Sequence, residues 1–199
     1  MKENGMKQIV FVLIGIVIVI AAVVIIKYKS LKTSEAHAEH RKGQAPPNVI
    51  NELREKLFTM PPTELGLSPS NKLPNVWGVV MEIGFPDSTA TLFSLAEGTT
   101  SLYFSSGGGI IGGGGHEAVR KTASEFLAAG EMSRSLAKPA PEHPLPKSGM
   151  IRFYILTYTG VVTVEAEEAN ISKQGHPLYN LFLAGNGVMT ELRLIEQRK

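Results

Sequence analysis

The chain has 199 residues, of which 43% are hydrophobic and 19% are charged, and it contains no cysteine. This length fits one domain of ordinary size with an additional segment. The apolar content excludes a disordered chain, and the lack of cysteine excludes disulfide frameworks, thiol nucleophiles and cysteine-based zinc sites. Residues 1–48 carry seven Lys and Arg against three Glu, whereas residues 49–199 carry 13 basic and 15 acidic side chains. Nucleic-acid binding is therefore not predicted, because no basic face is expected beyond residue 48.

Residues 9–26 are 18 consecutive residues without a charged or strongly polar side chain. As a helix they would span about 27 Å, close to the hydrocarbon thickness of a bilayer. We expect a transmembrane helix here, preceded by a short flank of residues 1–8. A cleaved signal peptide is the alternative, but the run exceeds the roughly 7–15 apolar residues of such peptides. The one A-x-A match, at residues 36–38, also lies far beyond the run.

The charges on either side of the apolar run predict its orientation. Lys2 and Lys7 precede the run, and five basic residues follow it between residues 27 and 42. Positive flanks stay in the cytoplasm, so we expect a single-pass protein of the cell membrane with a cytoplasmic C-terminal domain. Residues 27–48 mix charged with small side chains and are expected to form a flexible tether, whose basic part lies near anionic headgroups.

Residues 49–199 carry the pattern of one globular domain. Apolar residues at helical spacing first predict a helix that ends before Pro61 and Pro62. These apolar residues are Val49, Ile50, Leu53, Leu57 and Phe58. Residues 76–83, 89–95 and 100–104 then predict three strands. The connections between these strands are short and rich in turn residues, which indicates antiparallel neighbours.

The second half of the domain also contains predicted helices and strands. Residues 107–115 hold seven glycines and lead into a helix expected over 116–135. A proline-rich connection over 138–149 follows, and residues 150–157 and 161–167 predict a second hairpin. A helical period then continues from residue 178 to residue 195.

This order of helix, three strands, helix, two strands and helix predicts an α+β fold. We expect one five-stranded antiparallel sheet that carries about three helices and follows the single N-terminal transmembrane helix. The order of elements resembles that of the roadblock, longin and profilin-like group. The resemblance is an analogy of element order, because no sequence motif accompanies it, and a shared fold does not imply a shared function.

The glycine-rich stretch is the most conspicuous candidate site. It satisfies G-x-G-x-x-G, but no parallel βαβ unit surrounds it and no Gly-Lys-Ser/Thr follows, so the dinucleotide and Walker motifs are not supported. Backbone N–H groups at the start of the helix could instead hold an anion or contact a partner. The residues that would do so are Gly112, Gly113, Gly114, Gly115 and His116. We favour the other interpretation, in which the glycines permit positive φ and close packing.

No catalytic or metal-binding constellation emerges from the remaining residues. His116 and Glu117 begin a match to the zincin pattern H-E-x-x-H, but Arg120 takes the place of the second histidine. Glu165 and Glu167 share one strand face, which does not give the contrasting environments that an acid–base pair needs. We therefore predict no cofactor, no metal and no catalytic residues. Trp77 is expected to be an anchor in the core or at the edge of the sheet.

Two hypotheses of function follow. The first is a single-pass membrane protein, held in the lipid bilayer by residues 9–26, whose cytoplasmic α+β domain is a non-catalytic interaction or sensory module. The second is a regulatory domain that binds a nucleotide or another anionic small molecule at the glycine loop, residues 107–115. The protein partner and the oligomeric state, a homo-oligomer included, are not determined by the sequence.

Overall fold

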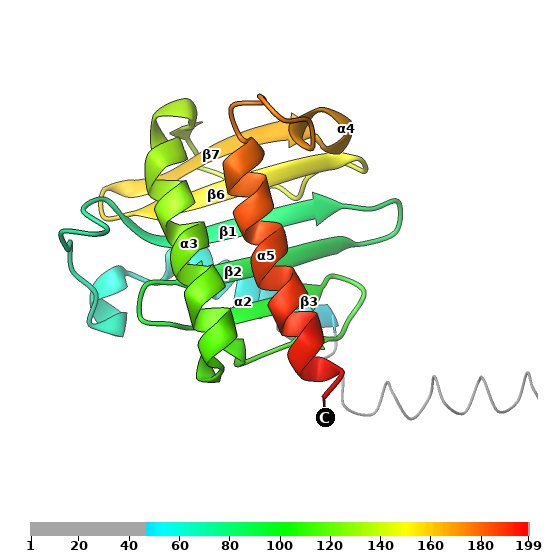
Figure 1. The fold of residues 1–199 in the computed structure, drawn as a ribbon, viewed down its shortest axis with the longest axis horizontal. Helices are drawn as coiled ribbons and strands as arrows, with labels where there is room; N and C mark the ends of the chain where they lie inside the picture. Colours follow the sequence, from blue (N-terminus) through cyan, green and yellow to red (C-terminus); the bar gives the residue numbers. More distant parts are fainter. Residues whose placement is uncertain (1–46, 199) are drawn as a thin grey trace, which may run out of the picture. The chain divides into compact units, whose positions relative to one another are not determined.

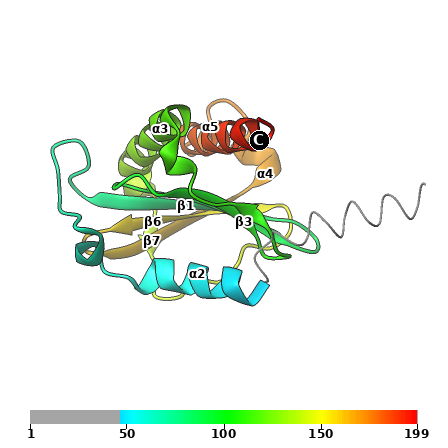
Figure 2. The same ribbon diagram turned by 90° about the horizontal axis from the view of Figure 1, so that it is seen from below.

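The structure is a computed structural model that describes residues 47–198. These residues form one antiparallel sheet with helices on both of its faces (Figures 1 and 2). The elements in chain order are α2 (Pro47–Thr59), the 3-10 helix η1 (Pro62–Leu65), β1 (Val76–Gly84), β2 (Thr89–Leu95), β3 (Thr100–Phe104), β4 (Gly109–Ile110), η2 (Gly113–Gly115), α3 (Glu117–Ser133), η3 (Arg134–Leu136), β5 (Lys138–Pro139), β6 (Met150–Thr157), β7 (Gly160–Glu167), α4 (Glu168–Ile171) and α5 (Tyr179–Glu196).

The strands lie in the order β4-β3-β2-β1-β6-β7-β5, and every neighbouring pair is antiparallel. The prediction of five strands and about three helices was wrong, because residues 47–198 form seven strands and four α-helices. The five predicted strands form the middle of the sheet, and the two-residue strands β4 and β5 extend its two edges. Strands this short carry no alternating pattern, and the four-residue helix α4 is too short to show a helical period.

The predicted transmembrane helix at residues 9–26 lies outside the residues that the structure describes. Among residues 47–198, no helix is both long enough and apolar enough to cross a membrane.

The larger core lies between the sheet and the helices α3 and α5, which run side by side on one face (Figure 1). Strand β1 lies at the centre of the sheet, where Val79 pairs with Ile155 and Met81 with Phe153 of β6. All four side chains are fully buried beneath the two helices. Gly185 brings α5 close to the sheet, because a Cβ atom there would lie 2.8 Å from the sulfur of Met81.

Helix α2 covers part of the opposite face of the sheet (Figure 2). A smaller core forms there, in which Leu57 of α2 packs with Trp77, Val80 and Leu156. Trp77 is buried in this core, as predicted, and its indole N–H donates a hydrogen bond to the carbonyl oxygen of Thr157 at 3.1 Å. Because both faces of the sheet are covered at its centre, all nine residues of β1 are buried.

Candidate functional site

The glycine loop connects β3 to α3 and is held mostly by its own backbone. The N–H groups of Gly115 and His116 donate to the carbonyl oxygens of Gly112 and Gly113, at 3.4 and 3.0 Å. The carbonyl oxygens of Gly114 and Gly115 accept hydrogen bonds from Nη1 of Arg120 at 3.1 and 2.9 Å. This end of the loop therefore presents carbonyl oxygens to a cation. Three of the five N–H groups that were candidates for anion binding already have partners, since the N–H of Gly112 donates to Oγ of Ser101 at 3.3 Å.

Close packing explains why two of the loop positions are glycine. A Cβ atom at Gly113 would lie 2.2 Å from Cδ2 of Leu192 in α5, and one at Gly114 would lie 2.0 Å from the carbonyl oxygen of Gly98. Gly112 has a φ of 76°, in the left-handed region that favours glycine. The side chain of His116 is exposed and makes no capping hydrogen bond to α3. These contacts support the structural interpretation of the loop.

The substitution Gly114→Ala is expected to lower the free energy of unfolding by about 1–3 kcal/mol, because the added methyl group meets the backbone of Gly98. The matched control is Gly115→Ala, where nothing lies within 4 Å of the new Cβ atom. We expect the control to change stability by no more than about 0.5 kcal/mol. Urea denaturation of the two variants measures the difference. Equal losses at both positions would contradict the packing explanation.

A buried ion pair fastens α2 to the sheet. Nε and Nη2 of Arg54 donate to the two carboxylate oxygens of Glu82 in β1, at 2.6 and 3.0 Å. Nη2 also donates to the carbonyl oxygen of His143 at 2.6 Å, and the hydroxyl of Thr91 donates to Glu82 at 3.2 Å. Glu82 has no exposed surface. The pair thus joins α2, the central strand and the proline-rich connection before β6.

Aromatic side chains surround this ion pair. The ring of Phe58 stacks on that of His143 with 4.1 Å between centroids, and the Arg54 guanidinium lies 5.0 Å from the centre of the Phe58 ring. Burial, and then the charge of Arg54, lower the pKa of His143. Burial, and then the charge of Glu82, raise the pKa of Tyr103. Among the described residues, the hydroxyl of Tyr103 and Nε2 of His143 are buried without a hydrogen-bond partner. The cluster therefore contains neutral rings packed around one satisfied charge pair.

This ion pair was not predicted, although the sequence carries a signal for it. Arg54 lies between Ile50 and Leu57 on the buried face of α2, and Glu82 interrupts the apolar sequence of β1. A charge at a core position in each of two elements is a sign of pairing. The two residues are 28 positions apart, so the sequence does not say which charge faces which.

The acidic residues singled out at the end of β7 do not form a catalytic pair. Oε2 of Glu165 accepts a hydrogen bond from Nη2 of Arg152 at 2.7 Å, and Glu167 accepts one from the side chain of Asn170. Within residues 47–198, no three His, Asp or Glu side chains are placed to hold a metal ion.

Two cavities lie near the glycine loop, one on each side of the turn between β2 and β3. The first, which we call the α2 groove, has a volume of about 240 Å³ and separates α2 from β2 and β3. It is lined mainly by apolar side chains, with a few polar ones among them: Leu53, Lys56, Leu57, Met60, Leu65, Phe93, Leu95, Glu97, Thr99, Ser101, Tyr103 and Ile111.

The second, which we call the α3 cavity, has a volume of about 700 Å³. It opens to the surface and is lined by residues of the segment from Leu67 to Leu73, by the β2–β3 turn, by the first turns of α3 and by Tyr158. Arg120, the residue that binds the glycine loop, lines this cavity, whereas the loop glycines 112–115 do not. Leu95 and Glu97 line both cavities, so the β2–β3 turn is a wall that they share.

The fold and its cavities define a three-layered α+β domain with two candidate binding sites. Comparison of the chain with protein-family models, with curated proteins and with solved structures gives no match. The resemblance in element order to the roadblock, longin and profilin-like group therefore gains no support from a similar structure.

Proposed function

We propose that this chain is a single-pass membrane-anchored protein whose α+β domain is a non-catalytic interaction module on the cytoplasmic side of the membrane. The apolar run of residues 9–26 and the basic residues after it support the anchor and its orientation. The α2 groove supports the interaction: it is an apolar surface left open beside a helix on the less covered face of the sheet.

Two exposed aliphatic side chains mark this groove. Leu53 on α2 is 41% exposed, and Ile111 in the glycine loop is 62% exposed. Both line the groove together with buried residues of the smaller core, such as Leu57 and Leu95. Apolar side chains that line one hollow, rather than standing singly on the surface, are typical of an interaction site.

The size and charges of the groove indicate its occupant. Its volume of about 240 Å³ lies below the roughly 300–1,000 Å³ typical of small-molecule pockets, so it suits one or two large side chains of a peptide. Lys56 lies among its lining residues from α2, and Glu97 among those from the β2–β3 turn. Within residues 47–198 neither of them forms an ion pair. The occupant that fits is a short segment of a partner protein, with a large apolar anchor and an acidic residue near Lys56.

The test is a selection of displayed random peptides on the full-length protein. We expect enrichment of peptides in which an aliphatic or aromatic anchor is accompanied by an acidic residue. The variants Leu53→Asp and Ile111→Asp should lose these peptides, because a carboxylate would then lie in the apolar groove. The matched control is Leu183→Asp, since Leu183 is 55% exposed but lies on α5, on the other face of the sheet.

The variant Lys56→Glu makes the selection specific for the proposed charge contact. It should shift the enriched companion residue from acidic to basic. No enrichment at all, or peptides that bind Leu53→Asp and Ile111→Asp as well as the parent protein, would refute the proposal. The alternative function, a nucleotide or anion site at the glycine loop itself, is not favoured by any contact described above.

A further inference from the structure

The α3 cavity has the size and composition of a small-molecule site. Its volume of about 700 Å³ falls within the range typical of such sites. Its apolar wall includes Leu67, Leu73 and Leu127, and its polar groups include Lys72 and Arg120. An apolar body with a few placed polar groups is the composition expected of a ligand pocket.

The wall opposite α3 is held in place by hydrogen bonds. The N–H of Ser70 donates to the carbonyl oxygen of Leu73, and the N–H of Leu73 donates to the hydroxyl of Ser70, each at 3.1 Å. The hydroxyl of Tyr158, from the turn between β6 and β7, donates to the carbonyl oxygen of Ser68 at 2.7 Å. Residues 68–73 thus form a braced wall, and the cavity is part of the folded structure.

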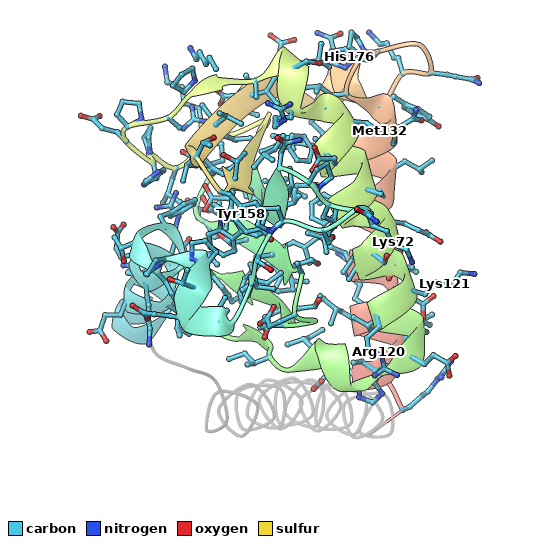
Figure 3. The ribbon with its side chains drawn as sticks, turned by 90° about the vertical axis from the view of Figure 1, so that its left-hand side faces the viewer. Lys72, Arg120, Lys121, Met132, Tyr158 and His176 are labelled. Atoms are coloured by element: carbon cyan, nitrogen blue, oxygen red, sulfur yellow. The ribbon has the colours of Figure 1, made fainter. Side chains whose placement is uncertain are left out.

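The two cationic side chains that line this cavity, Lys72 and Arg120, have hydrogen-bond donors available for an anion. Lys72 and Arg120 lie on the same face of the domain, Lys72 from the segment beside α3 and Arg120 from the first turn of that helix (Figure 3). Neither forms an ion pair within the described part of the chain. Arg120 uses Nη1 for the carbonyl oxygens of Gly114 and Gly115, which holds its guanidinium in position and leaves Nε and Nη2 as donors. Three charged residues line the cavity, and Glu97 is the only one of them that is negative.

We propose that the α3 cavity binds a small molecule with an apolar body and one anionic group, either a carboxylate or a phosphate. The anion is attracted by the two cationic side chains of the lining, Lys72 and Arg120, and the apolar body lies against Leu73 and Leu127. This site is distinct from both the α2 groove and the backbone N–H groups of the glycine loop, and it adds a ligand-binding activity to the interaction proposed above.

The test uses four probes of defined chemistry with the full-length protein in lipid nanodiscs. 4-Phenylbutyrate and phenyl phosphate combine an aromatic body with an anion, 4-phenylbutyramide has the body alone, and inorganic phosphate has the anion alone. Ligand-observed NMR titrations should show saturable binding of one or both aromatic anions. We expect the amide and inorganic phosphate to bind at least about tenfold more weakly, since each lacks one of the two contacts. Comparison of the two aromatic anions tells carboxylate from phosphate.

Three variants and a matched control locate the site. Lys72→Gln and Arg120→Gln should each weaken binding of the aromatic anions by about fivefold, the effect of one partly exposed charge pair. Ser124→Phe should block the site, because Ser124 is an exposed lining residue and the new ring fills the cavity. The control is Lys121→Gln, whose parent residue neighbours Arg120 on α3 but does not line the cavity.

Several results would overturn this proposal. One is that neither aromatic anion binds saturably. Another is that the amide binds as tightly as the anions. The third is that Lys121→Gln weakens binding of the aromatic anions as much as Lys72→Gln does. Arg120 also supports the glycine loop, so its substitution could alter the fold. Lys72 makes no hydrogen bond within residues 47–198, and its variant therefore tests the charge without that complication.

Discussion

Replacing Arg54 with alanine is expected to lower the free energy of unfolding by about 3–5 kcal/mol, because the variant leaves a buried carboxylate without its cation. Glu82 has no exposed surface and would keep only the hydrogen bond from Thr91. The substitution also removes the contact between α2 and the carbonyl oxygen of His143. It therefore loosens the helix from the sheet and from the connection before β6.

Trp77 provides the measurement, since it is the only tryptophan of the chain and is buried on the α2 face of the sheet. Its fluorescence should follow denaturation of the full-length protein in urea. The control is Glu55→Ala, because Glu55 is exposed and lies 3.6 Å from Nη1 of Arg54. We expect that variant to change stability by no more than about 0.5 kcal/mol.

The double variant Arg54→Met, Glu82→Met separates the buried charge from the packing around it. It should recover most of the stability lost in Arg54→Ala, because no unpaired charge remains in the interior. If the double variant is as unstable as the single one, the loss comes from packing, and the explanation by an unpaired carboxylate is wrong.

Replacing Leu192 with alanine is expected to lower the free energy of unfolding by about 2–5 kcal/mol. Leu192 has no exposed surface and lies in the larger core, and its Cδ2 atom approaches Gly113 closely. The shortened side chain would leave a void between α5 and the glycine loop, where the backbone cannot collapse freely.

Leu194 supplies a control of the same residue type on the same helix. It is 36% exposed, and its replacement by alanine should cost no more than about 1 kcal/mol, since little apolar surface is buried there. Denaturation curves of the two variants give the comparison. Similar losses at both positions would mean that the buried face of α5 has been assigned incorrectly.

The elements that could be predicted from the sequence are those whose side chains form a clear apolar pattern. Strands β2, β3 and β6 have the predicted bounds, because each alternates or concentrates apolar residues between turn residues. Helix α5 was also predicted as one continuous helix, because its apolar stripe keeps a 3.6-residue period to Ile195. The edge strands β4 and β5 could not be predicted, because they are held by backbone hydrogen bonds between short segments.

The candidate sites were less accessible to prediction than the fold. The glycine loop is conspicuous in the sequence because a run of glycines is a local signal. The α3 cavity instead combines Lys72, Arg120 and Tyr158, which come from three separate parts of the chain. The α2 groove likewise joins Leu53 to Ile111 across the sheet. Such groupings depend on the order of the strands, which single residue patterns do not encode.

The β2–β3 turn has a consequence for any two molecules that occupy the cavities on either side of it. Because Leu95 and Glu97 belong to both walls, a displacement of the turn by one occupant changes the surface offered to the other. Thermodynamic linkage makes this effect reciprocal. If a ligand in the α3 cavity changes the affinity of the α2 groove for its partner by some factor, the bound partner changes the affinity of the cavity for the ligand by the same factor. Through this one turn, a bound partner would set the concentration at which the domain responds to its ligand, and the ligand would set the partner concentration at which the groove is filled.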